Sequence, residues 1–241
     1  MLVKYAGGVR TRARQRRAYH LSLQLSLRIL TPEDVLDMLH RHMLTLNCGS
    51  RMAAKIDPLL TVADLDACPE DNNRYELIEG ELFGSRAPGI PHQLIMNNLQ
   101  LIFGAYLKKN PIGILVPRTG AIFSDYDAVI PDLAFVRNER WDQVVTGEKF
   151  TGALDLIIEV TSRGTENRRR DLLVKRQLYG KYGIAKYWVV DTDNHQIEIY
   201  RLKEQQLETA GVFRNNDELE TTTLPGFKLR VNEVFNLKQA P

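Results

Sequence analysis

The strongest constraint on the fold is the segment 154–160, in which a short apolar run is followed by the carboxylate of Glu159. Three consecutive apolar residues, Leu156-Ile157-Ile158, favour a strand that is covered on both faces, which requires a layer of structure on each side. Strand alternation then places Asp155, Glu159 and Thr161 on one face. A carboxylate at Glu159 among buried apolar neighbours is costly unless a cation or hydrogen bonds compensate it. The run therefore predicts an α/β protein with a polar site at the end of this strand.

The remaining periodicities predict helices and further strands around it. Residues 92–109 place apolar side chains at helical spacing, and Asn110-Pro111 ends that helix. Glu79-Gly80-Glu81 separates two apolar segments and predicts a hairpin, because glycine accepts a positive φ. We therefore expect the α/β class, with one mixed β-sheet flanked by helices. The other expected elements are helices at 61–67 and 167–182, strands at 113–116, 120–124, 131–136, 186–191, 195–202 and 227–229, a polar loop at 137–152 and a closing segment at 231–235.

The first 51 residues differ in composition from the rest. They contain nine Lys or Arg and three Asp or Glu, and the first 30 residues have no acidic side chain. This composition resembles a transit peptide or a tail that binds nucleic acid. The interpretation that we favour is a basic, disordered extension from an upstream start codon, since Met52 begins a segment of ordinary composition. The predicted organisation is this extension, 1–51, and one folded domain, 52–241.

Composition argues against several functional classes. Cys48 and Cys68 have no His in ligand spacing, so we expect no zinc site and a reduced, cytoplasmic location. No apolar run approaches the ~20 residues of a membrane-spanning helix. The sequence has no GxGxxG, P-loop or nucleophile elbow, which disfavours a small-molecule α/β enzyme. Residues 52–241 carry 23 basic and 27 acidic side chains, so contact with DNA requires a local basic surface.

Two carboxylates are expected to converge at one edge of the sheet. Asp132 follows Pro131 near the start of a predicted strand, and Glu159 ends another. Such a pair can hold Mg²⁺, which prefers hard oxygen ligands, and the carbonyl of Val160 would add a third ligand. The ion would polarise a phosphate and lower the pKa of an attacking water. Each residue alone has a simpler interpretation, because Pro-Asp often marks a turn and a strand Glu often lies at the rim.

The helix that follows supplies candidate cations. Asp171, Lys175 and Tyr179 are spaced four residues apart and share one helix face. If that face packs on the sheet, Lys175 reaches the strand ends that carry the two acids, where it would orient water and stabilise charge on a phosphate. The alternative is a solvated face on which Asp171 and Lys175 form a surface ion pair. Four arginines of this helix are candidate contacts to the DNA backbone: Arg168, Arg169, Arg170 and Arg176.

Taken in order, these motifs resemble the Uma-type restriction endonuclease family, a branch of the PD-(D/E)XK nuclease superfamily. The resemblance spans about residues 60–235 and leaves 1–51 without a counterpart. It implies a restriction-endonuclease-like core and DNA cleavage that depends on Mg²⁺, with Mn²⁺ as a substitute. The matching motifs are YELIEGEL at 75–82, Pro91-His92, Pro131-Asp132, DLIIEVTS at 155–162, DLLVK at 171–175 with Tyr179, and YGIAKYWVVD at 182–191.

The resemblance also implies roles for individual residues. Asp132 and Glu159 would be metal ligands, and Lys175 would be the catalytic cation. In this family the lysine that the superfamily carries on the strand moves to the following helix, which matches Thr161 and Lys175 here. Two further residues match less closely. The resemblance gives Glu76 as another acid near the metal, and His92 as a base or a phosphate contact, although His92 alternatively caps its helix.

The sequence thus predicts a Mg²⁺-dependent endonuclease that hydrolyses DNA phosphodiester bonds, with a homodimer as one possible assembly. The alternative is a catalytically inactive, nuclease-like module that binds nucleic acid or a protein partner. Thr161 in place of a strand lysine and the net acidic character of residues 52–241 favour that alternative.

Overall fold

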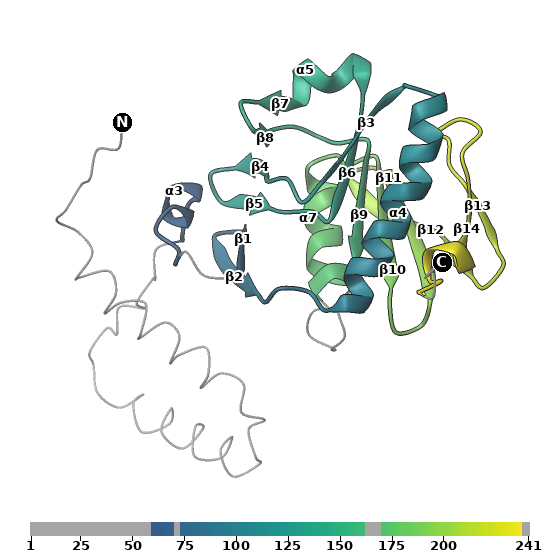
Figure 1. Cartoon of the computed structure of the whole chain (residues 1–241). Helices are drawn as coiled ribbons and strands as arrows, with labels where there is room; N and C mark the ends of the chain where they lie inside the picture. The colour runs from purple at the N-terminus through teal and green to yellow at the C-terminus, as the bar shows by residue number, and fades with distance from the viewer. Residues whose placement is uncertain (1–58, 70–72, 162–169, 238–241) are drawn as a thin grey trace, which may run out of the picture. The chain divides into compact units, whose positions relative to one another are not determined.

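The structure is a computed structural model, and it describes residues 59–69, 73–161 and 170–237 (Figure 1). The chain divides into two units, residues 1–56 and 57–241, and the elements described below belong to the second. The predicted extension, residues 1–51, lies outside the described residues, so its boundary and character stay predictions.

A six-stranded mixed sheet contains the apolar run, in the strand order β12-β11-β10-β9-β6-β3. The run is strand β9, Leu156–Val160, and all five of its residues are buried. It pairs in parallel with β10 on one edge and antiparallel with β6 on the other. The other strands of this sheet are β3 (Gly113–Pro117), β6 (Leu133–Arg137), β10 (Lys186–Asp191), β11 (Gln196–Lys203) and β12 (Gln206–Arg214).

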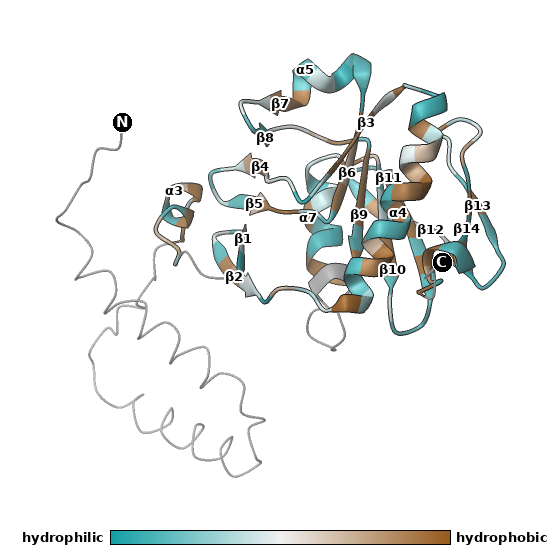
Figure 2. Ribbon diagram, viewed as in Figure 1, coloured by the Kyte–Doolittle hydropathy of each residue, from teal (hydrophilic) through white to brown (hydrophobic). Residues whose placement is uncertain are grey.

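Helices cover both faces of this sheet, as the alternation along β9 requires (Figure 1). Ile158 packs in one core with Phe103 of helix α4, whereas Ile157 packs in a second core with Tyr179 of helix α7. Figure 2 shows apolar residues concentrated on the central strands between these helices. The helices of the two faces are α4 (Ile90–Lys109), the π-helical turn η2 (Arg170–Lys175), α7 (Arg176–Lys181) and the short α8 (Val231–Val234).

A second six-stranded mixed sheet, in the order β2-β1-β5-β4-β8-β7, carries the predicted hairpin. β1 and β2 pair antiparallel, and Gly80 in their turn has a φ of 77°, as expected. The α/β class is therefore confirmed, with two mixed sheets where the sequence predicted one. The remaining elements are α3 (Val62–Leu65), β1 (Arg74–Ile78), β2 (Glu81–Ser85), β4 (Ala121–Ser124), β5 (Asp127–Val129), η1 (Asn138–Arg140), α5 (Trp141–Val144), β7 (Val145–Thr146), β8 (Lys149–Phe150), β13 (Glu218–Glu220) and β14 (Lys228–Arg230).

Some boundaries differ from the predicted ones for physical reasons. The predicted polar loop at 137–152 contains η1, α5, β7 and β8, which are too short to show a hydrophobic period. Strand β6 begins at Leu133, so Pro131 and Asp132 precede the strand, consistent with the missing N–H of proline. The predicted closing segment at 231–235 is helix α8. Within the described part of the chain, no helix has the length and apolar character needed to cross a membrane.

The buried carboxylate of Asp127 connects the second sheet to α7. One of its oxygens accepts the backbone N–H of Glu79 at 2.7 Å, and the other accepts the hydroxyl of Tyr182 at 2.6 Å. The second oxygen also accepts Lys181 Nζ at 3.1 Å. Burial alone would raise the pKa of Asp127, but the hydrogen bonds from Tyr182 and Glu79 and the ammonium of Lys181 lower it overall. Asp127 therefore stays ionised and holds the hairpin turn against the helix end.

We expect Asp127→Asn to lower the free energy of unfolding near neutral pH by about 1–3 kcal/mol, because three partly buried hydrogen bonds lose their charged acceptor. The native pKa lies below the ordinary value of 3.8, so this stabilisation is fully present above pH 3.8 and is lost as the pH falls further. Urea unfolding at neutral pH and in acid measures the difference, which should shrink in acid.

Glu208→Gln is the matched control, because it removes a carboxylate from an exposed pair with Lys203. It should leave the urea midpoint unchanged. A neutral-pH midpoint for Asp127→Asn equal to that of the wild type would contradict the proposed role of this carboxylate.

Candidate active site

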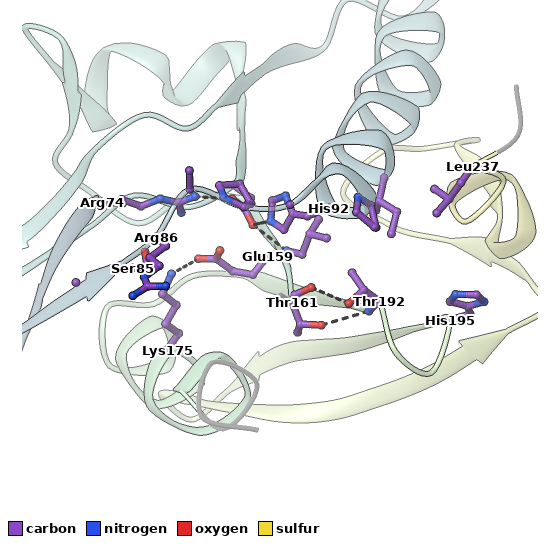
Figure 3. A pocket seen from close by; sticks show the side chains of 18 residues that line it. Arg74, Ser85, Arg86, His92, Glu159, Thr161, Lys175, Thr192, His195 and Leu237 are labelled. Atoms are coloured by element: carbon purple, nitrogen blue, oxygen red, sulfur yellow. Dashed lines mark hydrogen bonds and ion pairs between the residues drawn. The ribbon is translucent and has the colours of Figure 1, made fainter. Parts of the chain in front are cut away.

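The end of β9 faces a pocket with a volume of about 540 Å³ (Figure 3). Strand β1, the segment 84–89, the first turn of α4, the turn after β10 and η2 all contribute to its lining. The pocket brings together four residues that the sequence singled out: Asp132, Glu159, Lys175 and His92. All four side chains are almost completely buried, so charged groups there need close partners.

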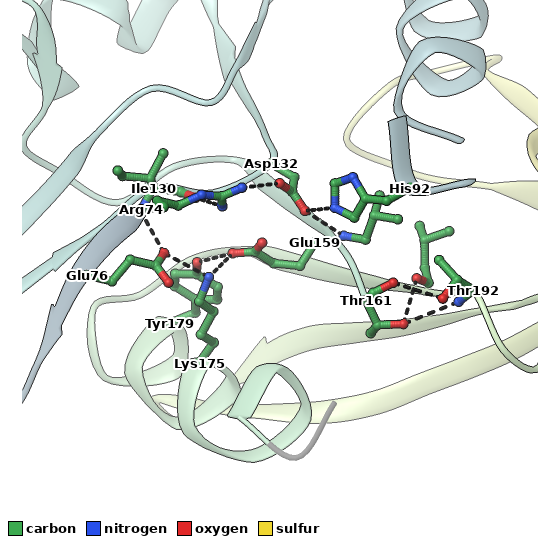
Figure 4. Close-up of polar contacts among 12 residues, drawn as sticks. Arg74, Glu76, His92, Ile130, Asp132, Glu159, Thr161, Lys175, Tyr179 and Thr192 are labelled. Carbon is green, nitrogen blue, oxygen red and sulfur yellow. Dashed lines mark hydrogen bonds and ion pairs between the residues drawn. The ribbon is translucent and has the colours of Figure 1, made fainter. Parts of the chain in front are cut away.

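Asp132 is held by three donors from three different elements. Its Oδ1 accepts the guanidinium of Arg74 at 3.1 Å. Its Oδ2 lies 3.1 Å from His92 Nε2 and accepts the backbone N–H of Val160 at 3.0 Å (Figure 4). Burial works to raise the pKa of Asp132, but the hydrogen bond and charge of His92, the charge of Arg74 and the N–H of Val160 hold it well below its usual value. The carboxylate is therefore ionised and fixed in orientation.

Lys175, which lines the pocket, links two carboxylates. Its Nζ donates to Glu159 Oε1 at 2.8 Å and to Glu76 Oε1 at 2.9 Å. The hydroxyl of Tyr179 donates to the same Glu159 oxygen at 2.8 Å (Figure 4). Burial, followed by the charge of Glu159, raises the pKa of the Tyr179 hydroxyl well above its usual value, so Tyr179 stays a neutral donor. Lys175 and Tyr179 of the predicted helix face thus both contact Glu159, while the side chain of Asp171, the third residue of that face, lies outside the described part of the chain.

The arginines proposed as DNA contacts are described only in part. Arg168 and Arg169 lie outside the described residues, and for Arg170 only the backbone is described. The guanidinium of Arg176 lies 5.2 Å from the ring centroid of Tyr200, and Arg176 does not line the pocket. Contact of these four residues with DNA stays a prediction.

Thr161, where the resemblance led us to look for a strand lysine, makes structural hydrogen bonds. Its side chain is buried and accepts the N–H of Thr192 at 3.2 Å, while the hydroxyl of Thr192 donates to the carbonyl of Thr161 at 2.9 Å. These bonds fasten the end of β9 to the turn that follows β10. The side chain of Thr161 is thus used in structural hydrogen bonds. The ammonium beside Glu159 comes from Lys175.

Arg74 is the site residue that sequence reasoning missed. It is the first residue of β1, and its guanidinium donates to the carbonyl of Ile130 at 2.8 Å and to Asp132 at 3.1 Å. The side chain lines the pocket and is only 17% exposed. A lone arginine beside a hairpin has the sequence pattern of a solvated edge residue. No local signal relates it to Asp132, which lies 58 positions later.

The donor set suits a hard divalent cation. Asp132 and Glu159 both line the pocket, and carboxylate oxygens are the ligands that Mg²⁺ prefers. Within the described residues, no group of three or more His, Cys, Asp or Glu side chains is arranged to hold a metal. Mg²⁺ usually keeps several waters and uses only one or two protein carboxylates, so the two acids fit this ion better than zinc.

A family model described as "Putative restriction endonuclease", Uma2, matches residues 62–232, which is more than half of the chain. The chain belongs to the Uma2 family. The resemblance inferred from the motifs is thereby confirmed. The comparison with curated proteins found no match.

A solved structure supports the fold of this Uma2 protein. A putative nuclease belonging to DUF820 from Anabaena variabilis has a TM-score of 0.61 at 19% identity, over 74% of this chain and 98% of that one. At this identity the similarity shows the fold alone. The type IIG restriction endonuclease BpuSI matches with a TM-score of 0.34 at 12% identity, over 61% of this chain and 15% of that one, which supports no argument.

Burial of the Lys175 ammonium between two carboxylates leads to a prediction about the free energy of unfolding. Lys175→Met leaves Glu76 and Glu159 buried without their shared cation, so we expect the free energy of unfolding near neutral pH to fall by about 3–5 kcal/mol. Adding Glu159→Gln should recover part of that loss, because one of the two buried charges is then removed. Urea unfolding of the single and double variants measures both effects.

Lys203→Met provides the matched control, since Lys203 is exposed and paired with Glu208. It should leave stability unchanged. If Lys175→Met were equally harmless, the ammonium would not be holding the two acids together.

Proposed function

We propose that this protein is a Mg²⁺-dependent endonuclease that hydrolyses phosphodiester bonds of DNA. The observation that carries the proposal is the meeting of Asp132, Glu159 and Lys175 at one pocket, from three separate elements of the fold. Membership of the Uma2 family supports the same chemistry. Two acids and one cation at the end of a buried strand are the groups that phosphodiester hydrolysis with a metal requires.

The residues of the pocket have distinct proposed tasks. Asp132 and Glu159 would hold the ion, which supplies polarisation of the phosphate and a lower pKa for bound water. Lys175 keeps an ammonium beside Glu159, where its charge would stabilise the phosphate during attack. Glu76 fixes Lys175 through the bond to its Nζ, and His92 fixes Asp132. We therefore assign Glu76 and His92 as positioning residues of the proposed site.

DNA is the proposed partner, and its contacts would come from exposed polar side chains that line the pocket. Arg86 would supply a positive charge, and His195 would supply hydrogen bonds. Cleavage of both strands by a chain with one site would use two copies, so we include a homodimer in the proposal, together with action in the cytoplasm. Sedimentation velocity with and without duplex DNA would measure the assembly.

Asp132→Asn tests the catalytic assignment, because it keeps the shape of the side chain and removes its charge. We expect nicking of supercoiled plasmid in Mg²⁺ or Mn²⁺ to fall by about 100-fold or more, since a metal ligand is weakened. Gel quantification of nicked and linear product over time gives the rates. Circular dichroism establishes that the variant is folded.

Asp155→Asn is a closely matched control. Asp155 is also buried, also precedes a strand and also binds an arginine and a backbone N–H, but it does not line the pocket. Its plasmid cleavage rate should stay close to that of the wild type. Equal rates for wild type, Asp132→Asn and Asp155→Asn would exclude Asp132 from the chemistry.

A nuclease-like module without catalytic activity is the second candidate. It is favoured by the pairing of Asp132 and Glu159 with Arg74 and Lys175, and by the two-carboxylate donor set among the described residues. Calorimetric titration with Mg²⁺, followed by fluorescence anisotropy with duplex DNA, separates the two. DNA binding without any Mg²⁺ binding would favour the module over the enzyme.

A further inference from the structure

Two arginine–aspartate clamps hold the two ends of the β6–β9 ladder. At the pocket end, Asp132 lies just before β6 and accepts the N–H of Val160, the last residue of β9. Arg74 bridges this carboxylate and the carbonyl of Ile130. The clamp thus ties a strand start to the end of its antiparallel neighbour.

The clamp at the other end has the same pattern. Asp155 lies just before β9 and accepts the N–H of Arg137, the last residue of β6, at 3.0 Å. Arg140 donates to Asp155 at 2.8 Å and to the carbonyl of Ala153 at 2.6 Å. Each clamp has one arginine, one carboxylate, one backbone N–H and one backbone carbonyl. A clamp of this kind therefore also occurs at a ladder end that does not line the pocket.

The surroundings of the two arginines differ in charge. Burial works to lower the pKa of Arg74, but the charges of Asp132, Glu159 and Glu76 raise it overall. Three carboxylates therefore act on the charge of Arg74, and Asp132 is hydrogen bonded to it. Arg140 has its ion pair with Asp155 and lies outside the pocket.

We propose that Arg74 is a resident counter-ion that weakens divalent-metal binding at the pocket, an inference that rests on the proposed function. Its guanidinium lies against Asp132 Oδ1, so a metal on that carboxylate must be bound beside a fixed positive charge. Replacing Arg74 by a neutral residue removes one positive charge from beside Asp132 and leaves the site more negative by one unit, so Mg²⁺ is then attracted more strongly.

The same charge difference gives Arg74 a role toward the proposed substrate. With a divalent ion bound, the site with Arg74 is more positive by one unit than the site without it. A more positive site attracts a phosphodiester anion more strongly. Arg74 thus lowers affinity for the metal and raises affinity for the substrate.

Calorimetric titration of the full chain with Mg²⁺ tests the proposal in three variants. Arg74→Gln should bind Mg²⁺ about tenfold more tightly than the wild type, because a partly screened unit charge a few ångströms away is worth about that much. Arg74→Lys keeps the charge and should stay close to the wild type. Arg140→Gln removes an arginine from the matching clamp and should leave the affinity unchanged.

Each result decides between the charge role and a structural role. If Arg74 only held Asp132 in place, its replacement would displace Asp132, and the affinity for Mg²⁺ would fall. Unchanged or weaker binding by Arg74→Gln therefore overturns the inference and leaves the proposed function standing. No Mg²⁺ binding by any variant overturns the proposed metal dependence and this inference with it. If Arg74→Gln does not fold, Arg74→Met is measured in its place with the same expected result. An equal gain in Mg²⁺ affinity in Arg74→Lys, which keeps the charge, also overturns the charge role.

Discussion

The ammonium of Lys175 is the interaction on which the arrangement of the site depends. It is buried between Glu76 of one sheet and Glu159 of the other, so it is compensated only where both sheets are correctly placed. Removing such an ion from water is costly, and close carboxylates recover that cost only with good geometry. The site and the packing of the two sheets are therefore specified by the same contact. A π-helical turn places the lysine there, which fits the tendency of such turns to occur at functional positions.

The sequence predicted the parts of this site that follow from local periodicity. The apolar run around Glu159 shows a buried strand, and a four-residue spacing places Lys175 and Tyr179 on one helix face. Arg74 and the bonds between Thr161 and Thr192 depend on tertiary pairing between distant segments, which no local pattern encodes. The second sheet was missed for a related reason. Several of its strands are two or three residues long, too short for alternation to be visible.

Acids and cations of the site are paired with one another before any metal is considered. Arg74 pairs with Asp132, Lys175 pairs with Glu76 and Glu159, and most of these side chains are almost fully buried. A divalent ion would add two positive charges to this set. Family membership and the Anabaena variabilis relative establish the fold on which this electrostatic arrangement is built. In the proposed nuclease, the chemistry would depend on how the ion and the resident cations share the same two carboxylates.

The matching clamps at the two ends of the β6–β9 ladder distinguish residues that hold the strands from residues specific to the candidate site. Asp155 and Arg140 show that an acid and an arginine hold a ladder end away from this pocket as well. Asp132 and Arg74 would therefore keep a structural use in a relative that had lost Lys175 or Glu159. Finding the aspartate in such a homologue is weak evidence for a nuclease. The more informative pair is Lys175 and Glu159, because the clamp formed by Asp155 and Arg140 contains no counterpart of either.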